Sequence, residues 1–225
     1  MNKQGLKAGI TAGLPVFAGY FPVAVTFGLM AASMNISLWE TLAFSVFVFA
    51  GASQFVALNM IQSGAGAAQI SLAVFLLNFR HLLMSASLST KLEISRPAVP
   101  VIAFGITDET FAISSMRSET LTGWFMAGLN FTAYAGWVLG TAAGYAAGDF
   151  LPSMLRESMS ICLYALFVAI LVPGIKKVRS AGITAAMGGG FNSILSYIAL
   201  LNSGWNIIIS IITASLLSFI FIKGE

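Results

Sequence analysis

The placement of charged residues constrains this chain more than any other feature. Only 8% of its 225 residues are charged, while 58% are hydrophobic. A helix that crosses a bilayer needs about 20 apolar residues. This composition excludes a soluble enzyme, a nucleic-acid-binding protein and a disulfide-stabilised secreted domain. We therefore expect an all-α, polytopic membrane protein, because Asp, Glu, Lys and Arg are absent from residues 8–39, 41–79, 120–148, 158–175 and 180–222.

Turn-forming residues divide the apolar stretches into helices. They predict eight transmembrane helices in a single transporter domain over residues 1–225. The expected spans lie near 9–33, 40–61, 67–90, 97–116, 120–146 and 154–174, with two more on either side of 202–204. Seven spans is the alternative, if one segment is re-entrant and buried inside the protein.

Basic residues predict the orientation of these helices. With eight spans and both termini in the cytoplasm, three basic residues fall outside, namely Lys91, Arg96 and Arg156. The basic residues inside are then Lys3, Lys7, Arg117, Lys176, Lys177, Arg179 and Lys223, which agrees with the positive-inside rule. A shift of 112 residues aligns Phe55-Val-Ala57 with Phe167-Val-Ala169. Two structural repeats therefore remain an alternative to an unrepeated bundle.

The third span carries a polar stripe on an otherwise apolar helix. At 100° per residue its polar side chains fall within about 80° of one another. Serines alone are typical of helix packing. An amide and an imidazole beside them favour a cavity. The stripe consists of Ser71, Asn78, His81, Ser85 and Ser89.

Arg80 points away from this stripe, deep inside the third span. The fourth span contains Asp108 and Glu109 at a similar depth. We expect an ion pair between Arg80 and this acidic pair, because an unpaired charge in a membrane is costly. Such a pair can be purely structural. Two carboxylates exceed what one arginine needs, so the surplus acid is a candidate site for a proton or a substrate ammonium group.

Proline and glycine predict breaks in several helices. Pro15 and Pro22 lie in the first span, Gly51 in the second, and Gly188, Gly189 and Gly190 in the seventh. A broken helix frees backbone groups and directs helix dipoles at the centre of a transporter. A proline kink or close packing of glycine is the alternative for any single position.

Three motifs then resemble a known family. They are Phe49-Ala-Gly-Ala-Ser-Gln-Phe55, Leu77-Asn-Phe-Arg-His-Leu-Leu83 and Thr107-Asp-Glu-Thr-Phe111. Together with Gly13-Leu-Pro15 and Gly19-Tyr20 they resemble the AzlC-type branched-chain amino acid permeases, the large subunits of LIV-E exporters, over essentially the whole chain.

The resemblance implies a secondary transporter that exports branched-chain amino acids across the bacterial inner membrane. It also implies a small AzlD-type membrane subunit as partner. The site residues that it implies are Ser53, Gln54, Asn78, Arg80, His81, Asp108 and Glu109. These side chains suit a zwitterion, since arginine, histidine and amides bind a carboxylate, and a carboxylate binds an ammonium group.

Three other classes of function stay open: an ion or proton channel, an intramembrane hydrolase and a non-transporting scaffold subunit. An ion or proton channel could use the charged residues, and an intramembrane hydrolase could pair His81 with a serine. The hydrolase motif G-x-S-x-G fails because Phe55 takes the place of its last glycine. The chain has a single histidine and a single cysteine. We therefore expect no enzyme activity, no catalytic residue, no metal and no cofactor.

Overall fold

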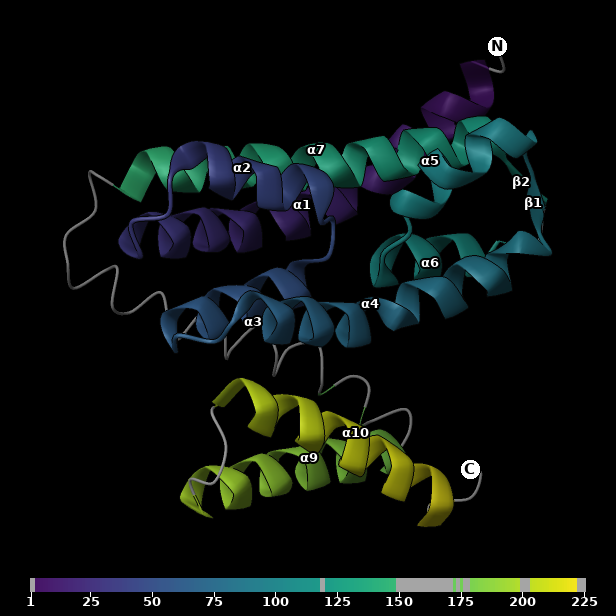
Figure 1. The fold of residues 1–225 in the computed structure, drawn as a ribbon. Coiled ribbons are helices and arrows are strands. Elements are labelled where there is room, and N and C mark those ends of the chain that lie inside the picture. The colour runs from purple at the N-terminus through teal and green to yellow at the C-terminus, as the bar shows by residue number, and fades with distance from the viewer. Residues whose placement is uncertain are drawn as a thin grey trace. The chain divides into compact units, whose positions relative to one another are not determined.

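The computed structural model describes residues 3–117, 120–148, 179–198 and 203–221, and the single residues 172 and 175 (Figure 1). The chain forms two compact units. The first unit comprises residues 1–54 and 77–159, and the second comprises 55–76 and 160–225. The predicted all-α membrane fold is confirmed. By length and hydropathy, two helices in the described part of the chain could cross a membrane, α1 (Lys3–Ser33) and α4 (Ala67–Ser89).

Helices α1 and α7 (Gly123–Gly148) form the central helix pair of the first unit. They pack in parallel, since Gly9 lies against Phe125 and Gly144 against Val25. A Cβ on Gly144 would lie only 2.1 Å from the Val25 carbonyl oxygen. Small residues recur at every fourth position of this face, which lets two helix backbones approach closely in a membrane. They are Gly128, Thr132, Gly136, Gly140, Gly144 and Gly148.

The predicted second span is a hairpin of two helices, α2 (Leu38–Phe47) and α3 (Gly51–Gln62). The hairpin starts where α7 ends, because Tyr145 donates a hydrogen bond to the Ile36 carbonyl. Helix α2 then runs back along α7. In α3 the chain reverses, since the Gln54 amide lies 3.4 Å from the Ser45 hydroxyl of α2.

The predicted fourth span is also a hairpin, of α5 (Val99–Phe104) and α6 (Asp108–Ser115). Strand β1 (Leu92–Glu93) and helix η1 (Arg96–Ala98) precede it, and β2 (Leu121–Thr122) follows it. The two strands pair in parallel, and the Lys91 ammonium donates to the Ser115 carbonyl. This segment therefore enters and leaves at the same end of the first unit, the end at which α7 begins (Figure 1).

A helix followed by a hairpin thus occurs twice, as α1 with the α2–α3 hairpin and α4 with the α5–α6 hairpin. The two hairpins enter from opposite ends of α7. The repeat expected from the 112-residue shift cannot be compared, because residues 167–169 lie outside the described residues. The sixth span predicted near 154–174 lies almost wholly outside them too, as do Arg156, Lys176, Lys177 and Lys223.

Several predicted helix breaks are wrong. Helix α1 continues through Pro15 and Pro22, and α9 (Arg179–Ile198) continues through Gly188, Gly189 and Gly190. A glycine keeps its N–H, and an apolar environment makes each unpaired backbone group costly, so glycines alone do not end a helix there. The break at Gly51 is confirmed, because α2 ends at Phe47.

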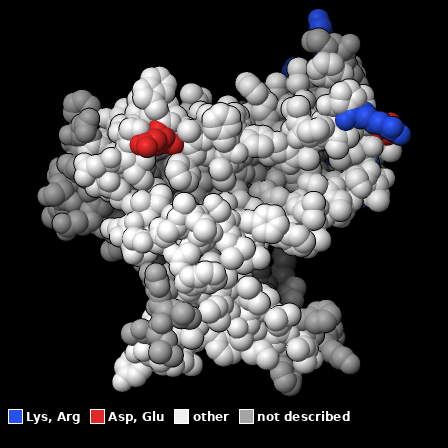
Figure 2. All heavy atoms as spheres, viewed as in Figure 1, with Lys and Arg blue, Asp and Glu red and all other residues white. Residues whose placement is uncertain are grey.

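Basic residues gather at one end of the first unit. Lys7 and Arg117 line the same groove beside Phe125. Lys91 and Arg96 adjoin β1, which pairs with β2 at this end. The prediction that Lys91 and Arg96 lie on the opposite side from Lys7 is therefore wrong, because the α5–α6 hairpin does not cross. In Figure 2, the Lys and Arg side chains on the visible face lie towards the end where α1 begins.

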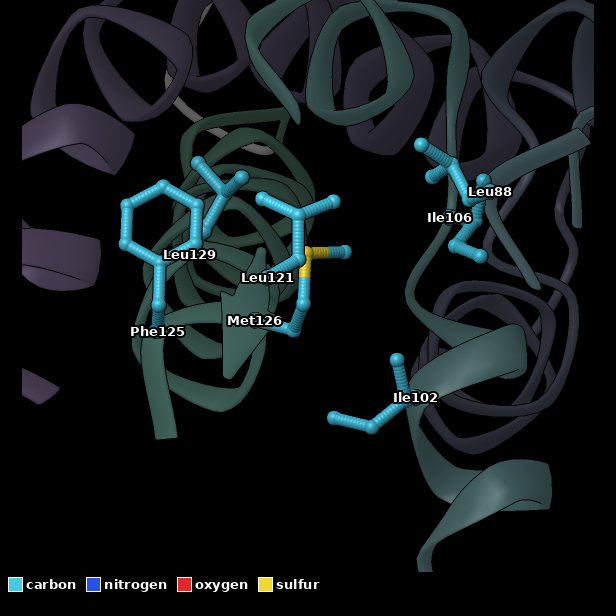
Figure 3. Packing of buried hydrophobic residues seen from close by; sticks show 7 residues of the cluster. All are labelled: Leu88, Ile102, Ile106, Leu121, Phe125, Met126 and Leu129. Atoms are coloured by element: carbon cyan, nitrogen blue, oxygen red, sulfur yellow. The ribbon is translucent and has the colours of Figure 1, made fainter. Parts of the chain in front are cut away.

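An apolar cluster fixes the second hairpin against α7 (Figure 3). It joins Leu88 of α4 and Ile102 of α5 to side chains of α7. Met126 and Leu129 in this cluster have no exposed surface. In a membrane such side chains stabilise the fold through close van der Waals packing, so the cluster fixes the position of the hairpin. The full set is Leu88, Ile102, Ile106, Leu121, Phe125, Met126 and Leu129.

In the second unit, α9 and α10 (Ser203–Phe221) form an antiparallel pair. The hydroxyls of Thr184 and Ser218 are 2.5 Å apart, and the Asn206 amide donates to Ser196. A small core joins Ile208 of α10 to the α3–α4 part of this unit, through Met60 and Ala73.

Candidate functional site

The turns of the two hairpins meet at an aromatic cluster beside the middle of α7. Phe49 of the first turn lies 5.2 Å from the Tyr134 ring, measured between centroids, and Phe104 of the second lies 6.0 Å from it. Tyr20 of α1 contacts Phe49 at 6.0 Å and Trp137 at 5.5 Å. Two interrupted helices therefore end at one place, inside the first unit.

Side chains satisfy the backbone of the first turn, residues 48–50. Tyr134 donates to the Val46 carbonyl, and Ser53 donates to the Ala50 carbonyl. Gln54 accepts a 2.7 Å hydrogen bond from the Trp137 indole. Ser53 and Gln54 are both fully buried. These two predicted site residues thus hold the turn together, and a direct part in binding remains a prediction for them.

The second turn, residues 105–107, leads directly into the N-terminus of α6 and supplies its capping residue. Thr107 caps α6 in a capping box with Thr110, and two carboxylates occupy the first helical turn. Negative charge at a helix N-terminus is stabilised by the helix dipole. Asn130 of α7 donates to the Ile102 carbonyl and fills the space beside Gly105. The start of α6 is therefore rigidly placed, with Asp108 and Glu109 at its tip.

The two carboxylates have different partners. Asp108 pairs with Arg80 of α4, with Nη1 2.7 Å from Oδ2, so the predicted ion pair is present. Glu109 instead accepts a hydrogen bond from the Tyr20 hydroxyl, whose oxygen also hydrogen-bonds to the Thr107 hydroxyl. Within the described residues, that ion pair is the one recorded salt bridge. Glu109 is thus the surplus acid.

Some buried polar atoms of α4 have no hydrogen-bond partner among the described residues. They are buried atoms of three neighbouring side chains: Asn78 Oδ1, Arg80 Nε and His81 Nε2. His81 lies against the backbone of Ile106, at the second turn. The side chains of Arg80 and His81 therefore both reach the second hairpin. Ser89, by contrast, bonds to its own helix at the Ala86 carbonyl.

Sequence reasoning missed several residues of this site. Tyr20 was part of a motif but had no role, although a phenol in a long charge-free stretch needs a hydrogen-bond partner. The pattern Thr107-Asp-Glu-Thr110 is a helix-start signature that could have located the second turn. Asn130 and Trp137 of α7 also belong to the site, but they are part of no sequence pattern that predicts a site.

The described residues contain no group of three His, Cys, Asp or Glu side chains that could hold a metal ion. Charged side chains, amides and aromatic rings give the site its chemical character. It presents one cation, two carboxylates and several uncommitted donors and acceptors beside an apolar wall. Such a set can bind a small zwitterion or conduct a proton.

Comparison with known proteins decides the family. The model of the AzlC protein family matches residues 15–151, which include both hairpins and the whole of α7. The chain belongs to the AzlC family. Like its relatives, this AzlC-family protein is a membrane protein, and the family supports a role in membrane transport.

Three relatives illustrate the breadth of the AzlC family. An uncharacterized membrane protein of Archaeoglobus fulgidus is 36% identical over 82% of this chain and 81% of its own length. The inner membrane protein YgaZ of Escherichia coli is 30% identical over 83% of this chain and 80% of its own. The branched-chain amino acid transport protein AzlC of Bacillus subtilis is 26% identical, over 76% and 70% respectively. No solved structure matches this AzlC-family chain.

Proposed function

We propose that this protein is a secondary transporter that exports branched-chain and related small apolar amino acids across the bacterial inner membrane. The observation that carries the proposal is the meeting of two hairpin turns, which enter from opposite ends of α7, at a charged and aromatic site. Broken helices that meet at such a site are typical of secondary transporters. The printed name of the Bacillus subtilis relative supplies the substrate class.

The chemistry of the site suits this substrate. Arg80 Nε and His81 Nε2 can donate to a substrate carboxylate, and Glu109 can accept from its ammonium group. Phe104, which is 45% exposed and packs on the buried ring of Phe49, supplies an apolar surface for a branched side chain. A neutral sugar or a metal ion would not contact all of these donors, acceptors and apolar rings.

The orientation follows from the basic end of the first unit. Lys3, Lys7, Lys91, Arg96 and Arg117 all belong to the end at which α1 begins. The loop at the other end, residues 34–37, carries no Lys or Arg. By the positive-inside rule the N-terminus is cytoplasmic. We retain a cytoplasmic C-terminus and a small AzlD-type subunit as parts of the same proposal.

Counterflow of labelled leucine into proteoliposomes tests the proposal. The full-length chain is reconstituted with and without the small subunit, and with and without a pH gradient. Saturable exchange of leucine that glycine or glucose does not inhibit is the expected result. Current without saturation would instead indicate a channel, and hydrolysis of a peptide substrate an enzyme. Either result without leucine exchange would contradict the proposal.

Variants of the two carboxylates refine this test. We expect Asp108→Asn or Glu109→Gln to abolish gradient-driven leucine transport while the protein still reaches the membrane. Glu93→Gln, in strand β1 and remote from the turns, is the matched control and should transport normally. Normal transport by both Asp108→Asn and Glu109→Gln would remove these carboxylates from the mechanism.

A further inference from the structure

Tyr20 is the residue that touches both hairpin turns from a third element. Its ring packs edge-on against Phe49 of the first turn, with centroids 6.0 Å apart. Its hydroxyl bonds to Thr107 and Glu109 of the second turn. It belongs to α1, which packs along α7 and is therefore rigidly held. A displacement of either turn must alter a contact of Tyr20.

The hydroxyl of Tyr20 has a specific chemical task at Glu109. Glu109 is an exposed side chain with no recorded salt bridge among the described residues, so a hydrogen-bond donor is what holds its carboxylate in one position. Arg80 is committed to Asp108 at 2.7 Å, and His81 lies against the Ile106 backbone. The Tyr20 hydroxyl is therefore the recorded donor to Glu109 among the described residues.

We propose that Tyr20 is a positioning residue that holds the Glu109 carboxylate for its ligand and ties the release of this carboxylate to the first turn. The proposal rests on the proposed function. When Glu109 binds a proton or a substrate ammonium group, its negative charge is neutralised and its bond to the Tyr20 hydroxyl weakens. Tyr20 is then free to move against Phe49 and Trp137, and the first turn moves with it.

Four charged or titratable side chains lie at or near the contact between the Tyr20 hydroxyl and the Glu109 carboxylate. Tyr20 approaches Glu109 from α1, and Arg80 and His81 approach the second turn from α4. Asp108 is the neighbour of Glu109 on α6. Tyr20→Phe alters none of the other three and retains the ring contacts with Phe49 and Trp137. This variant therefore isolates the hydroxyl.

Transport measurements separate positioning from mere support of the fold. Tyr20→Phe should reduce gradient-driven leucine uptake by about tenfold, as expected for the loss of one charge-assisted hydrogen bond. Counterflow needs no gradient, and saturating leucine compensates for weaker binding by a displaced Glu109, so counterflow should stay within about twofold of the original. Equal losses in both assays or a normal Tyr20→Phe variant would overturn the proposal.

Thermal unfolding tests the contact without any substrate. Tyr20→Phe, Glu109→Ala and the double variant of the full-length chain form a cycle in detergent. The shifts in Tm should be non-additive, with the double variant less affected than the sum. Tyr145→Phe is the matched control, because its hydroxyl bonds the Ile36 carbonyl far from the turns, and it should add to Glu109→Ala. Additive shifts for Tyr20 would refute the link. If leucine is not transported at all, the proposed function fails and this cycle still decides the contact.

Discussion

Arg80 and Asp108 form an ion pair between α4 and the tip of α6, with Nη1 2.7 Å from Oδ2. Both side chains remain substantially exposed, at 42% for Arg80 and 48% for Asp108. A fully buried pair that loses one partner costs about 3–5 kcal/mol, whereas an exposed pair contributes at most about 1 kcal/mol. This pair lies between the two limits, so it locates the second hairpin without dominating the stability of the protein.

Removal of Arg80 should therefore destabilise the fold moderately. We expect Arg80→Ala to lower the free energy of unfolding by about 1–3 kcal/mol, because Asp108 is left without its partner. Arg80→Ala with Asp108→Ala should recover part of this loss. Chemical unfolding in detergent micelles, together with the amount of folded protein, provides the measurement. A double variant less stable than the sum of the single variants would contradict a structural role for the pair.

His81 should behave differently from its neighbour. Its Nε2 atom has no partner among the described residues, so truncation breaks no recorded hydrogen bond of that atom. We expect His81→Ala to leave the amount of folded protein near normal. Leucine counterflow should fall by about tenfold or more, as for the loss of a donor to a charged substrate. Ser89→Ala, on the same helix, is the control and should transport normally. Poor folding with normal specific transport would reverse the assignment.

The sequence could predict the ion pair but not the hairpins that present it. Counting residues from the ends of the predicted spans gives Arg80 and Asp108 the same depth in the membrane. This count correctly predicted that the two side chains lie side by side. The same counting assumes that each apolar stretch crosses the membrane. Residues 40–61 are long enough for one crossing helix or for two helices that double back, and hydropathy carries no sign of direction. The positions of Lys91 and Arg117 at one end depend on this reversal, so they were predicted on opposite sides.

The helix breaks predicted in α1 and α9 are wrong for a related reason. Proline and glycine are local signals, whereas a break in a membrane needs partners for the freed backbone groups. The first turn has these partners in Tyr134 and Ser53, and the second has them in Asn130 and Thr110. In each turn one of the two partners comes from α7, far along the sequence. A local pattern therefore does not reveal which glycine or proline lies at a break.

Glycines of α9 provide a direct test of this reasoning. A Cβ at Gly189 or Gly190 would meet no atom within 4 Å. Because alanine favours a helix over glycine by about 1 kcal/mol per residue, Gly189→Ala and Gly190→Ala should each raise the Tm slightly and preserve transport. Thermal unfolding of the full-length chain, with leucine counterflow as the second assay, measures both effects. Loss of transport in a stabilised variant would show that α9 must bend or open during transport.

The close approach of α1 and α7 leads to the opposite expectation for Gly144. A Cβ there would lie 2.1 Å from the Val25 carbonyl oxygen, which belongs to the backbone of a packed helix and cannot rotate away. Gly144→Ala should therefore force the two helices apart and cost about 1–3 kcal/mol, as overpacking does in other well-packed interiors. Gly19→Ala in α1 is the matched control, because a Cβ at Gly19 meets nothing within 4 Å. We expect a lower Tm and less folded protein for Gly144→Ala, and an unchanged or higher Tm for Gly19→Ala. If Gly144→Ala were as stable as the original chain, α1 and α7 could not pack as closely as the structure has them, and the rigid frame around Tyr20 would be lost with that contact.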